Sequence, residues 1–330
     1  MFSIIYVSLF VSKALAALTA DKPYYDLADA ENHFAEFVQE YDKKYGSHEE
    51  YNKRFEIFKN KLLHINKLNE EHDATFGVNK FSDLTFEEFA SSRFSVIPSK
   101  DVNATEMITV KKEWVINAPK SLDYRTLNMV THVKEQGFEC TPSDVFAAIG
   151  NIEGQYAKKH KKLVTLSEQQ IIDCVINSCR SPSVSKLLSD ICKTDGCVSE
   201  EHYPYAGELT ACQTGSKIEV KLKGFQELVV KNEDQLVGAT AHYGPIYTRL
   251  FLPSGAESYR GGIWAPTDCS SATNSAILVV GYGTDARSGK DFWILKNSWG
   301  SDWGEMGYLM LERGKSLCWI GSSCATSIVQ

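Results

Sequence analysis

The distribution of cysteines constrains the fold of this chain more than any other feature. All nine cysteines lie between Cys140 and Cys324, and residues 1–139 contain none. Disulfides form and persist in oxidising compartments, so a cysteine-rich segment that follows a cysteine-free one indicates two units of different construction. We therefore expect a cysteine-free N-terminal domain followed by a domain that disulfides staple together. At 330 residues, the chain can hold one large or two small domains.

The first residues are typical of a secretory signal peptide, which we predict for residues 1–17. An apolar run from Phe2 to Val11 precedes Ala14-Leu15-Ala16, a cleavage site of the A-x-A type. The run is too short to span a membrane; a buried N-terminal strand is the alternative. We expect a secreted protein or one in a lysosome-like or gut-lumen-like compartment. The net charge of −7 provides no basic field, so neither nucleic acid nor a membrane is expected as a partner.

The segment from residue 24 to about residue 90 has the periodicity of two amphipathic helices. In the first, apolar side chains recur with the i, i+3, i+4, i+7 spacing of one helical face, at Phe34, Phe37, Val38 and Tyr41. The second is expected to begin at Ser47, which forms a capping box with Glu50. Its apolar stripe consists of Tyr51, Phe55, Phe58, Leu62 and Ile65.

A third helix is predicted within Val133–Gln155. Thr141 is expected to be its N-cap, Pro142 suits the first helical position, and Asp144 would close a capping box. The close-packed face of this helix is expected to hold Phe146, Ala147, Ile149 and Gly150. The sequence therefore predicts a buried helix at the start of the cysteine-rich domain.

Two spaced motifs in the N-terminal domain resemble those of cathepsin L-type propeptides. The first is Glu50-x3-Arg54-x3-Phe58-x2-Lys61-x3-Ile65-x3-Asn69, in which Lys61 replaces an expected Asn. The second is Gly77-x-Asn79-x-Phe81-x-Asp83. The resemblance implies an inhibitory propeptide over residues 18–117, ending in an irregular linker over residues 90–117. Within that linker, Asn103 begins an N-glycosylation sequon. The sequence leaves open whether this site carries a glycan.

From Ala118-Pro119 onward the chain resembles the mature domain of papain-like cysteine proteases. The motif Leu166–Cys174 resembles the second helix of that family, and residues 277–283 and 292–300 resemble its central strands. The resemblance implies an α+β fold over residues 118–330, with a helical lobe, an antiparallel β-barrel-like lobe and a cleft between them. It also implies a monomer without cofactor or metal.

Six cysteines match the disulfide positions of the family. The resemblance implies the pairs Cys140–Cys179, Cys174–Cys212 and Cys269–Cys318, each worth about 2–4 kcal/mol. Three cysteines then remain, Cys192, Cys197 and Cys324. Either Cys192 and Cys197 form a local bridge, or these residues are buried thiols that act as small apolar side chains.

The residues that would perform thiol chemistry are missing from their positions. A papain-like protease needs a thiolate, a neighbouring imidazole, a group that orients the imidazole, and donors for the oxyanion. On the family pattern the nucleophile position is Ser143 and the histidine position is Ser275. Gln136 is kept as an oxyanion donor, although one extra residue separates it from Ser143. Asn297 and its shielding Trp299 are also kept, but Asn297 has no imidazole to orient.

Neighbouring positions also depart from the family. Asp144 places a carboxylate at the helix N-terminus, where the helix dipole would otherwise stabilise a thiolate. Ser181 and Pro182 stand where the family has two glycines that pair with an extended substrate, and proline lacks the N–H that such pairing needs. The alternative at Pro182 is simply a different turn. Cys140 as a displaced nucleophile is the other alternative at this site, although it would leave Cys179 unpaired.

The residues that support folding are thus kept and those that perform chemistry are lost, which indicates a pseudoenzyme. We expect a secreted papain-like protein without peptidase activity that works as a binding or decoy protein. Two alternatives stay open: an inhibitor whose prodomain engages active cysteine proteases, and a weak hydrolase that uses Ser143. The double serine exchange resembles inactive relatives of the mite group 1 allergens. The sequence does not name the protein or peptide partner.

Overall fold

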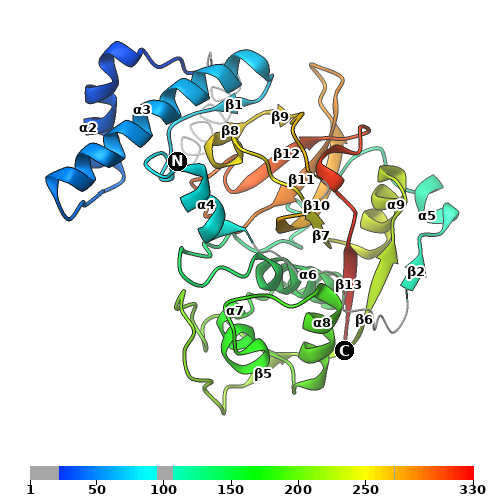
Figure 1. Cartoon of the computed structure of the whole chain (residues 1–330). Coiled ribbons are helices and arrows are strands. Elements are labelled where there is room, and N and C mark those ends of the chain that lie inside the picture. Colours follow the sequence, from blue (N-terminus) through cyan, green and yellow to red (C-terminus); the bar gives the residue numbers. More distant parts are fainter. Residues whose placement is uncertain (1–21, 95–106, 271) are drawn as a thin grey trace, which may run out of the picture.

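The computed structural model describes residues 22–94, 107–270 and 272–330. The described chain has a helical prodomain, a helical lobe and a β-rich lobe, which confirms the predicted α+β two-lobe fold (Figure 1). The predicted signal peptide at residues 1–17 and the sequon at Asn103 lie outside the described residues. None of the described helices is long and apolar enough to cross a membrane.

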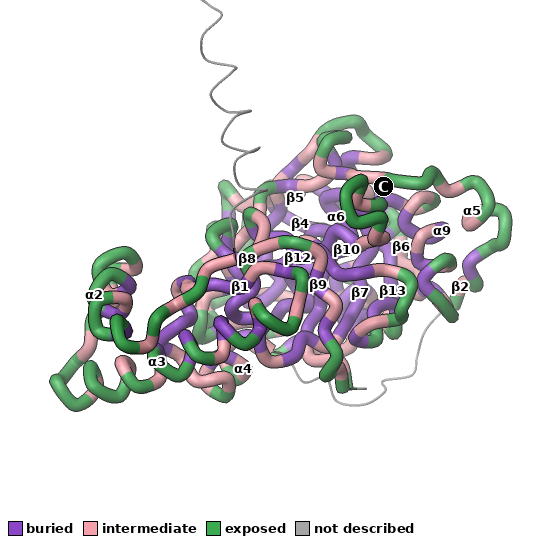
Figure 2. Tube along the Cα trace, turned by 90° about the horizontal axis from the view of Figure 1, so that it is seen from above, coloured by how far each residue is buried: buried purple, intermediate pink, exposed green. Residues whose placement is uncertain are grey.

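The prodomain is built on two helices whose aromatic faces pack together, as their periodicity predicts. Its elements are η1 (Leu27–Asp29), α2 (Ala30–Glu40), α3 (His48–Glu71), β1 (Thr75–Phe76) and α4 (Phe86–Arg93). The Ser47 hydroxyl accepts a hydrogen bond from the amide of Glu50 (3.1 Å), so helix α3 begins where predicted. Phe34, Phe58 and Leu62 are fully buried between α2 and α3. Both helices protrude from one side of the mature domain (Figure 2).

The segment after residue 106 is ordered, which corrects the prediction of an irregular linker there. It forms β2 (Met107–Thr109) and α5 (Lys112–Ile116). Strand β2 adds in parallel to the edge of the large sheet at β6 (Leu222–Val229). On α5, the Trp114 ring stacks on His242 with 4.0 Å between ring centroids. The local sequence does not predict this order, because contacts with β6 and His242 stabilise the segment and it has no helical or strand periodicity of its own.

The helical lobe surrounds the long central helix α6 (Ser143–His160). Its other elements are α7 (Glu168–Gln170), η2 (Ile171–Ile176), α8 (Val184–Lys193), β4 (Cys197–Val198) and β5 (Ile218–Val220). The apolar faces of α6, η2 and α8 form one cluster of buried residues that also reaches β7 and β10 of the other lobe. Helix α6 therefore lies at the junction between the two lobes (Figure 1).

The β-rich lobe is a mainly antiparallel sheet. Together with β6 it contains β3 (Leu122–Asp123), β7 (Ile246–Leu250), β8 (Tyr259–Gly261), β9 (Ile263–Trp264), β10 (Ser275–Thr284), β11 (Asp291–Lys296), β12 (Tyr308–Glu312) and β13 (Cys324–Val329), with helices α9 (Glu233–Tyr243), η3 (Ala256–Ser258) and η4 (Leu317–Trp319). The order in the large sheet is β2-β6-β13-β7-β10-β11-β12-β9, with β3 also paired to β10, while β8 pairs with prodomain strand β1. The prodomain thus extends the mature domain by backbone pairing.

The three predicted disulfides are confirmed. They join Cys140 to Cys179, Cys174 to Cys212 and Cys269 to Cys318. Cys192, Cys197 and Cys324 are free thiols. Of the two alternatives for these residues, the structure has the one without a local bridge.

Candidate functional site

Helix α6 begins at Ser143, but the predicted cap at its N-terminus is wrong. The N-cap is Pro142, which offers no side-chain hydrogen bond, and Thr141 precedes the helix. The Asp144 side chain does not close a capping box. It lies fully buried and is held by residues of the opposite lobe. A buried carboxylate is stabilised more by an opposite charge than by a local amide, and this outweighs the capping preference.

The partners of Asp144 are two residues of strand β7. The Tyr247 hydroxyl donates a hydrogen bond to Asp144 Oδ1 (2.6 Å), and Arg249 Nη1 forms an ion pair with the same oxygen. All three residues are buried. Burial opposes the charge of Arg249, but the Asp144 carboxylate outweighs it and the pKa of the guanidinium is raised. A charged bridge therefore joins the two lobes next to the nucleophile position.

The two predicted serine positions come together at the junction of the lobes. Ser143 and Ser275 are both fully buried, and the Ser143 hydroxyl accepts a hydrogen bond from the amide of Ala276 (3.2 Å). Within the described residues the Ser275 hydroxyl has no hydrogen-bond partner. The fold thus brings these two positions, which are far apart in sequence, close together. These two positions supply hydroxyl groups, and neither carries an imidazole or a thiol.

The hydrogen bonds of the retained residues Gln136 and Asn297 differ from those that an oxyanion donor and an imidazole-orienting residue would make. Gln136 is fully buried, and its Nε2 lies 3.4 Å from the carbonyl oxygens of Arg93 and Thr141. Its Oε1 accepts a hydrogen bond from the Ser298 hydroxyl (2.6 Å). Asn297 Oδ1 accepts from the amide of Ser298 (2.9 Å), whereas its Nδ2 is buried without a partner among the described residues. The amide that would orient an imidazole has therefore nothing to orient.

The end of the prodomain covers this region. Arg93, the last residue of α4, is fully buried and forms an ion pair with Glu135 (2.7 Å). Its guanidinium also lies over the rings of Phe81 (4.8 Å) and Phe138 (4.2 Å). Trp299 is fully buried as well, with its ring against the prodomain. The predicted shielding Trp299 is therefore part of the docking surface of the prodomain.

Ser181 and Pro182, which stand at the two glycine positions of the family, directly precede the N-cap of helix α8. Ser181 is buried and its hydroxyl has no partner among the described residues, and Pro182 is half-buried. Ser183 caps α8 by accepting a hydrogen bond from the amide of Lys186 (3.4 Å). Pro182 therefore lies in a turn that leads into a helix, and it has no amide hydrogen for an extended peptide.

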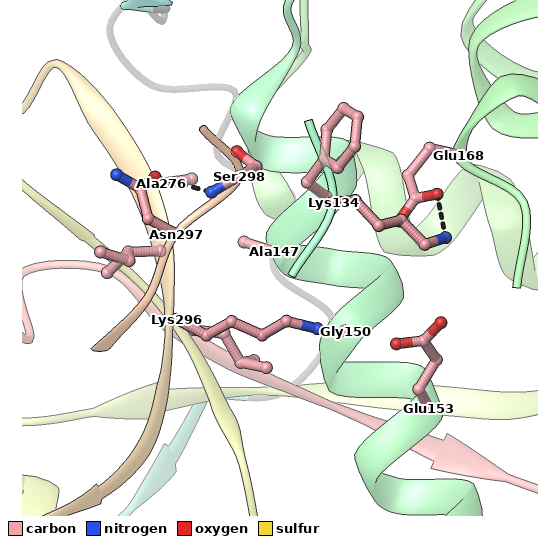
Figure 3. A pocket seen from close by; sticks show the side chains of 12 residues that line it. Lys134, Ala147, Gly150, Glu153, Glu168, Ala276, Lys296, Asn297 and Ser298 are labelled. Atoms are coloured by element: carbon pink, nitrogen blue, oxygen red, sulfur yellow. Dashed lines mark hydrogen bonds and ion pairs between the residues drawn. The ribbon is translucent and has the colours of Figure 1, made fainter. Parts of the chain in front are cut away.

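A small cavity of about 20 Å³ lies between α6 and strand β11, below the retained Asn297 (Figure 3). Lys134 Nζ forms an ion pair with Glu168 on one side (2.5 Å), and Lys296 extends toward α6 near Gly150 on the other. Burial lowers the pKa of Lys296, while Glu153 partly offsets this effect. No group of three or more His, Cys, Asp and Glu side chains in the described ranges could hold a metal ion. The cavity is too small for more than a water molecule.

Sequence reasoning missed Arg249, the residue that most changes the electrostatics of the site. The signal was available, since Arg249 interrupts an apolar strand pattern, and every residue of β7 is buried. A charged residue inside such a strand requires a buried partner. The partner, Asp144, is 105 residues away in sequence, so no local pattern identifies it.

Comparison with known proteins gives the same architecture throughout. Residues 118–328 match the family described as papain family cysteine protease, and residues 34–89 match the cathepsin propeptide inhibitor domain. The viral cathepsin of Spodoptera litura multicapsid nucleopolyhedrovirus is 35% identical over 340 residues, covering 99% of each chain. Cysteine proteinase 1 of Dictyostelium discoideum is 35% identical, covering 91% of this chain and 93% of its own. The structure of digestive procathepsin L 3 from Tenebrio molitor larval midgut superposes with a TM-score of 0.80 at 31% identity, covering 91% of this chain and 99% of the other.

Proposed function

This chain belongs to the papain family of cysteine proteases, and we propose that it is a member without peptidase activity, a secreted pseudoprotease that works as a binding or decoy protein. The observation that carries this proposal is the pair Ser143 and Ser275, which stand together at the nucleophile and histidine positions. A serine hydroxyl attacks only when a neighbouring base removes its proton. The position that would supply this base holds a second hydroxyl.

The surroundings of Ser143 support the proposal independently. The Asp144 carboxylate is in the first turn of α6, where it forms an ion pair with Arg249 and accepts a hydrogen bond from Tyr247. The residue after Ser143 is therefore occupied by a bridge between the lobes. The Gln136 amide, a potential oxyanion donor, lies beside the Arg93 carbonyl of the prodomain. Nucleophile, base and oxyanion donor thus all depart from the arrangement that hydrolysis needs. The weak-hydrolase alternative would have to use the Ser143 hydroxyl without an imidazole at the position of Ser275 and with Gln136 bonded elsewhere.

A peptidase assay tests this proposal directly. The prodomain is removed with an exogenous protease that is then inhibited, and turnover of cathepsin-type peptides is measured under reducing, mildly acidic conditions. We expect no turnover above that of the Ser143→Ala variant prepared in the same way. Turnover that disappears in Ser143→Ala would overturn the proposal and favour the weak hydrolase.

A second candidate function follows from the match of residues 34–89 to the cathepsin propeptide inhibitor domain. In this alternative the prodomain engages the cleft of an active cysteine protease. Gel filtration of the chain with an active papain-family enzyme, followed by an inhibition assay, separates this alternative from the binding or decoy function. Inhibition is expected only if the prodomain can leave its own mature domain.

Secretion through residues 1–17, a monomeric state, the glycosylation of Asn103 and a kinship with mite group 1 allergen relatives remain predictions within this proposal. Intact-mass analysis of the secreted protein checks the first and third of them. The new N-terminus and any glycan mass at Asn103 are both read from the same spectrum.

A further inference from the structure

An ion pair is buried in the contact between the prodomain and the mature domain. Lys61 lies on α3, at the position where the helical signature departs from the expected Asn, and its side chain is 7% exposed. Its Nζ is 2.5 Å from Oε1 of Glu257, which is 1% exposed and lies on η3 of the mature domain. The residue that breaks the propeptide signature therefore forms an ion pair across the contact.

Glu257 is held by both domains. Its Oε2 accepts a hydrogen bond from the amide of Gly255 in the mature domain (2.8 Å). Its backbone carbonyl accepts one from Nδ2 of prodomain Asn79 (2.6 Å), which is also buried. These two hydrogen bonds hold Glu257 in place with its carboxylate facing Lys61. Within the described ranges, Glu257 is the only partner of the Lys61 ammonium.

Buried apolar residues lie near the pair in sequence, and His64 is an ionisable neighbour of both charges. Leu62 and Ile65 on α3 and Ala256 and Tyr259 of the mature domain are fully buried nearby in sequence. Leu68 lies against Gly255, 3.0 Å from where a Cβ of that glycine would be. Water therefore has little access to either charge, and an unpaired charge in such a place is costly.

The other ion pairs across this contact each have a more exposed carboxylate: Arg93 is buried, but its partner Glu135 is 37% exposed. Lys290 reaches Asp73 at 2.5 Å, but the Asp73 side chain is 78% exposed, and Asp302, a partner of Lys80, is 53% exposed. Solvent replaces the partner of such charges at small cost. Only a buried charge penalises a partner that lacks the opposite charge, and this penalty produces specificity.

We propose that the Lys61–Glu257 pair determines which mature domain this prodomain binds, and that its partner is a papain-type mature domain with a carboxylate at the position of Glu257, which is first of all its own. A mature domain with an apolar, neutral or basic residue at that position would leave the Lys61 ammonium buried and unpaired. The prodomain is therefore matched to its own chain and rejects active relatives without this carboxylate. The proposal does not depend on whether Ser143 is catalytic.

A charge-exchange experiment on the full chain tests this. A recognition sequence for a site-specific protease is placed within residues 95–106, the folded protein is cut there, and the loss of the prodomain is followed by gel filtration and intact mass. The four forms compared are the unchanged chain, Lys61→Glu, Glu257→Lys and the double exchange. Lys67→Met on the same helix is the matched control, because Lys67 is 66% exposed and its ion pair is with Glu71 of its own helix.

We expect each single exchange to speed prodomain loss on the order of 100-fold or more, in line with breaking a buried pair. The double exchange should restore most of the retention, and Lys67→Met should behave as the unchanged chain. Retention in the single exchanges, or loss in the double exchange equal to that in the single ones, would overturn the proposal.

Two further measurements keep the test decisive. If Glu257→Lys fails to fold, Glu257→Gln keeps the shape and removes only the charge, and it should still speed prodomain loss at least tenfold. Hydrogen exchange of the intact, uncut chain should show faster exchange in α3 and η3 for Lys61→Glu but not for Lys67→Met. Equal exchange in these two variants would contradict a role of the pair in docking.

Discussion

The prodomain contact and the predicted catalytic positions meet along the chain at Glu135 and Gln136, but they differ in how their buried charges and hydroxyl groups are partnered. In the contact, buried cations reach a carboxylate of the other domain, as in Lys61–Glu257 and Arg93–Glu135, although Nε and Nη2 of Arg93 have no hydrogen-bond partner among the described residues. At the predicted histidine position and beside it, the Ser275 hydroxyl and Asn297 Nδ2 have no hydrogen-bond partner at all among those residues.

The difference indicates which interactions this protein depends on. A buried polar group without a partner costs free energy, so these groups do not contribute to the stability of the fold as the paired charges do. The one strong charge pair near Ser143 is Asp144–Arg249, which joins the two lobes. It stabilises the fold at the place where an active relative performs chemistry.

The largest effect is expected for catalysis. Losing a triad member costs up to about 10⁶-fold in rate. The double variant Ser143→Cys with Ser275→His places a thiol and an imidazole at the two positions where the family pattern has them. We expect the double variant to stay at least about 100-fold below an active papain-family enzyme assayed in parallel, because a misplacement of about 1 Å alone costs about that much. The Asp144 charge and the extra residue after Gln136 remain. Activity equal to that of the active enzyme would show that the surrounding residues matter little.

Breaking the bridge between the lobes should cost more stability than any surface change. Asp144→Ala leaves Arg249 buried without its counter-charge, which should lower the free energy of unfolding by about 3–5 kcal/mol. Denaturant unfolding of the full chain measures this. Asp190→Ala is the control, since Asp190 forms helix-surface pairs with Lys186 and Lys193 and should cost less than about 1 kcal/mol. The double change Asp144→Leu with Arg249→Met should recover most of the loss; if it does not, the pair is not the source of the effect.

A buried and an exposed charge of the prodomain should differ in the same way. Arg93→Met removes the ion pair with Glu135 and two ring contacts, and we expect prodomain docking to weaken by about 2 kcal/mol. Lys80→Met removes partly exposed pairs with Glu135 and Asp302 and should weaken it by less than about 1 kcal/mol. Hydrogen exchange of α4 in the intact chain reports both. The reverse order of the two effects would show that the exposed pairs carry the contact.

Thiol-directed epoxide probes should find no activated thiolate. Burial raises the pKa of Cys197 and of Cys324 to about 12, and it also raises the pKa of the half-buried Cys192. Reactivity requires the thiolate, so native protein should label slowly and at Cys192 first. Peptide mapping measures the site. Labelling of Cys140 would contradict its disulfide with Cys179 and reopen its role as a displaced nucleophile.

The smallest effect is a dependence of linker docking on pH. Partial burial lowers the pKa of His242, and Lys158 and Lys111 lower it further. When the segment that contains α5 is undocked, His242 on α9 binds a proton at a higher pH than when it is docked, so docking of α5 weakens as pH falls below the ordinary value of about 6.5. Hydrogen exchange of residues 107–116 should accelerate on acidification, and His242→Gln should remove this dependence.

Intact mass should still show full-length chain after acidification alone, and cleavage only with added protease.

Contiguous motifs determined much of this protein in advance. The spacing of Phe34 and Phe37 predicted a helical face, and the Gly77-to-Asp83 motif identified the prodomain. The positions of six cysteines led through the family resemblance to the observed disulfides. Such features depend on residues a few positions apart or on a fixed family pattern, so the sequence alone carries them. The absence of Cys and His at Ser143 and Ser275 is likewise a property of the sequence.

The partners of the buried charges became known only from the tertiary structure. Arg249 and Asp144 are 105 residues apart, and Lys61 and Glu257 are 196 residues apart. The local capping preference at Thr141 was overridden because Asp144 found a buried guanidinium. The segment of residues 107–116 was expected to be irregular, but it is ordered by the edge of strand β6 and by the ring of His242. In each case the deciding energy is that of burying a polar or aromatic group against a partner distant in sequence, and only the folded chain brings such partners together.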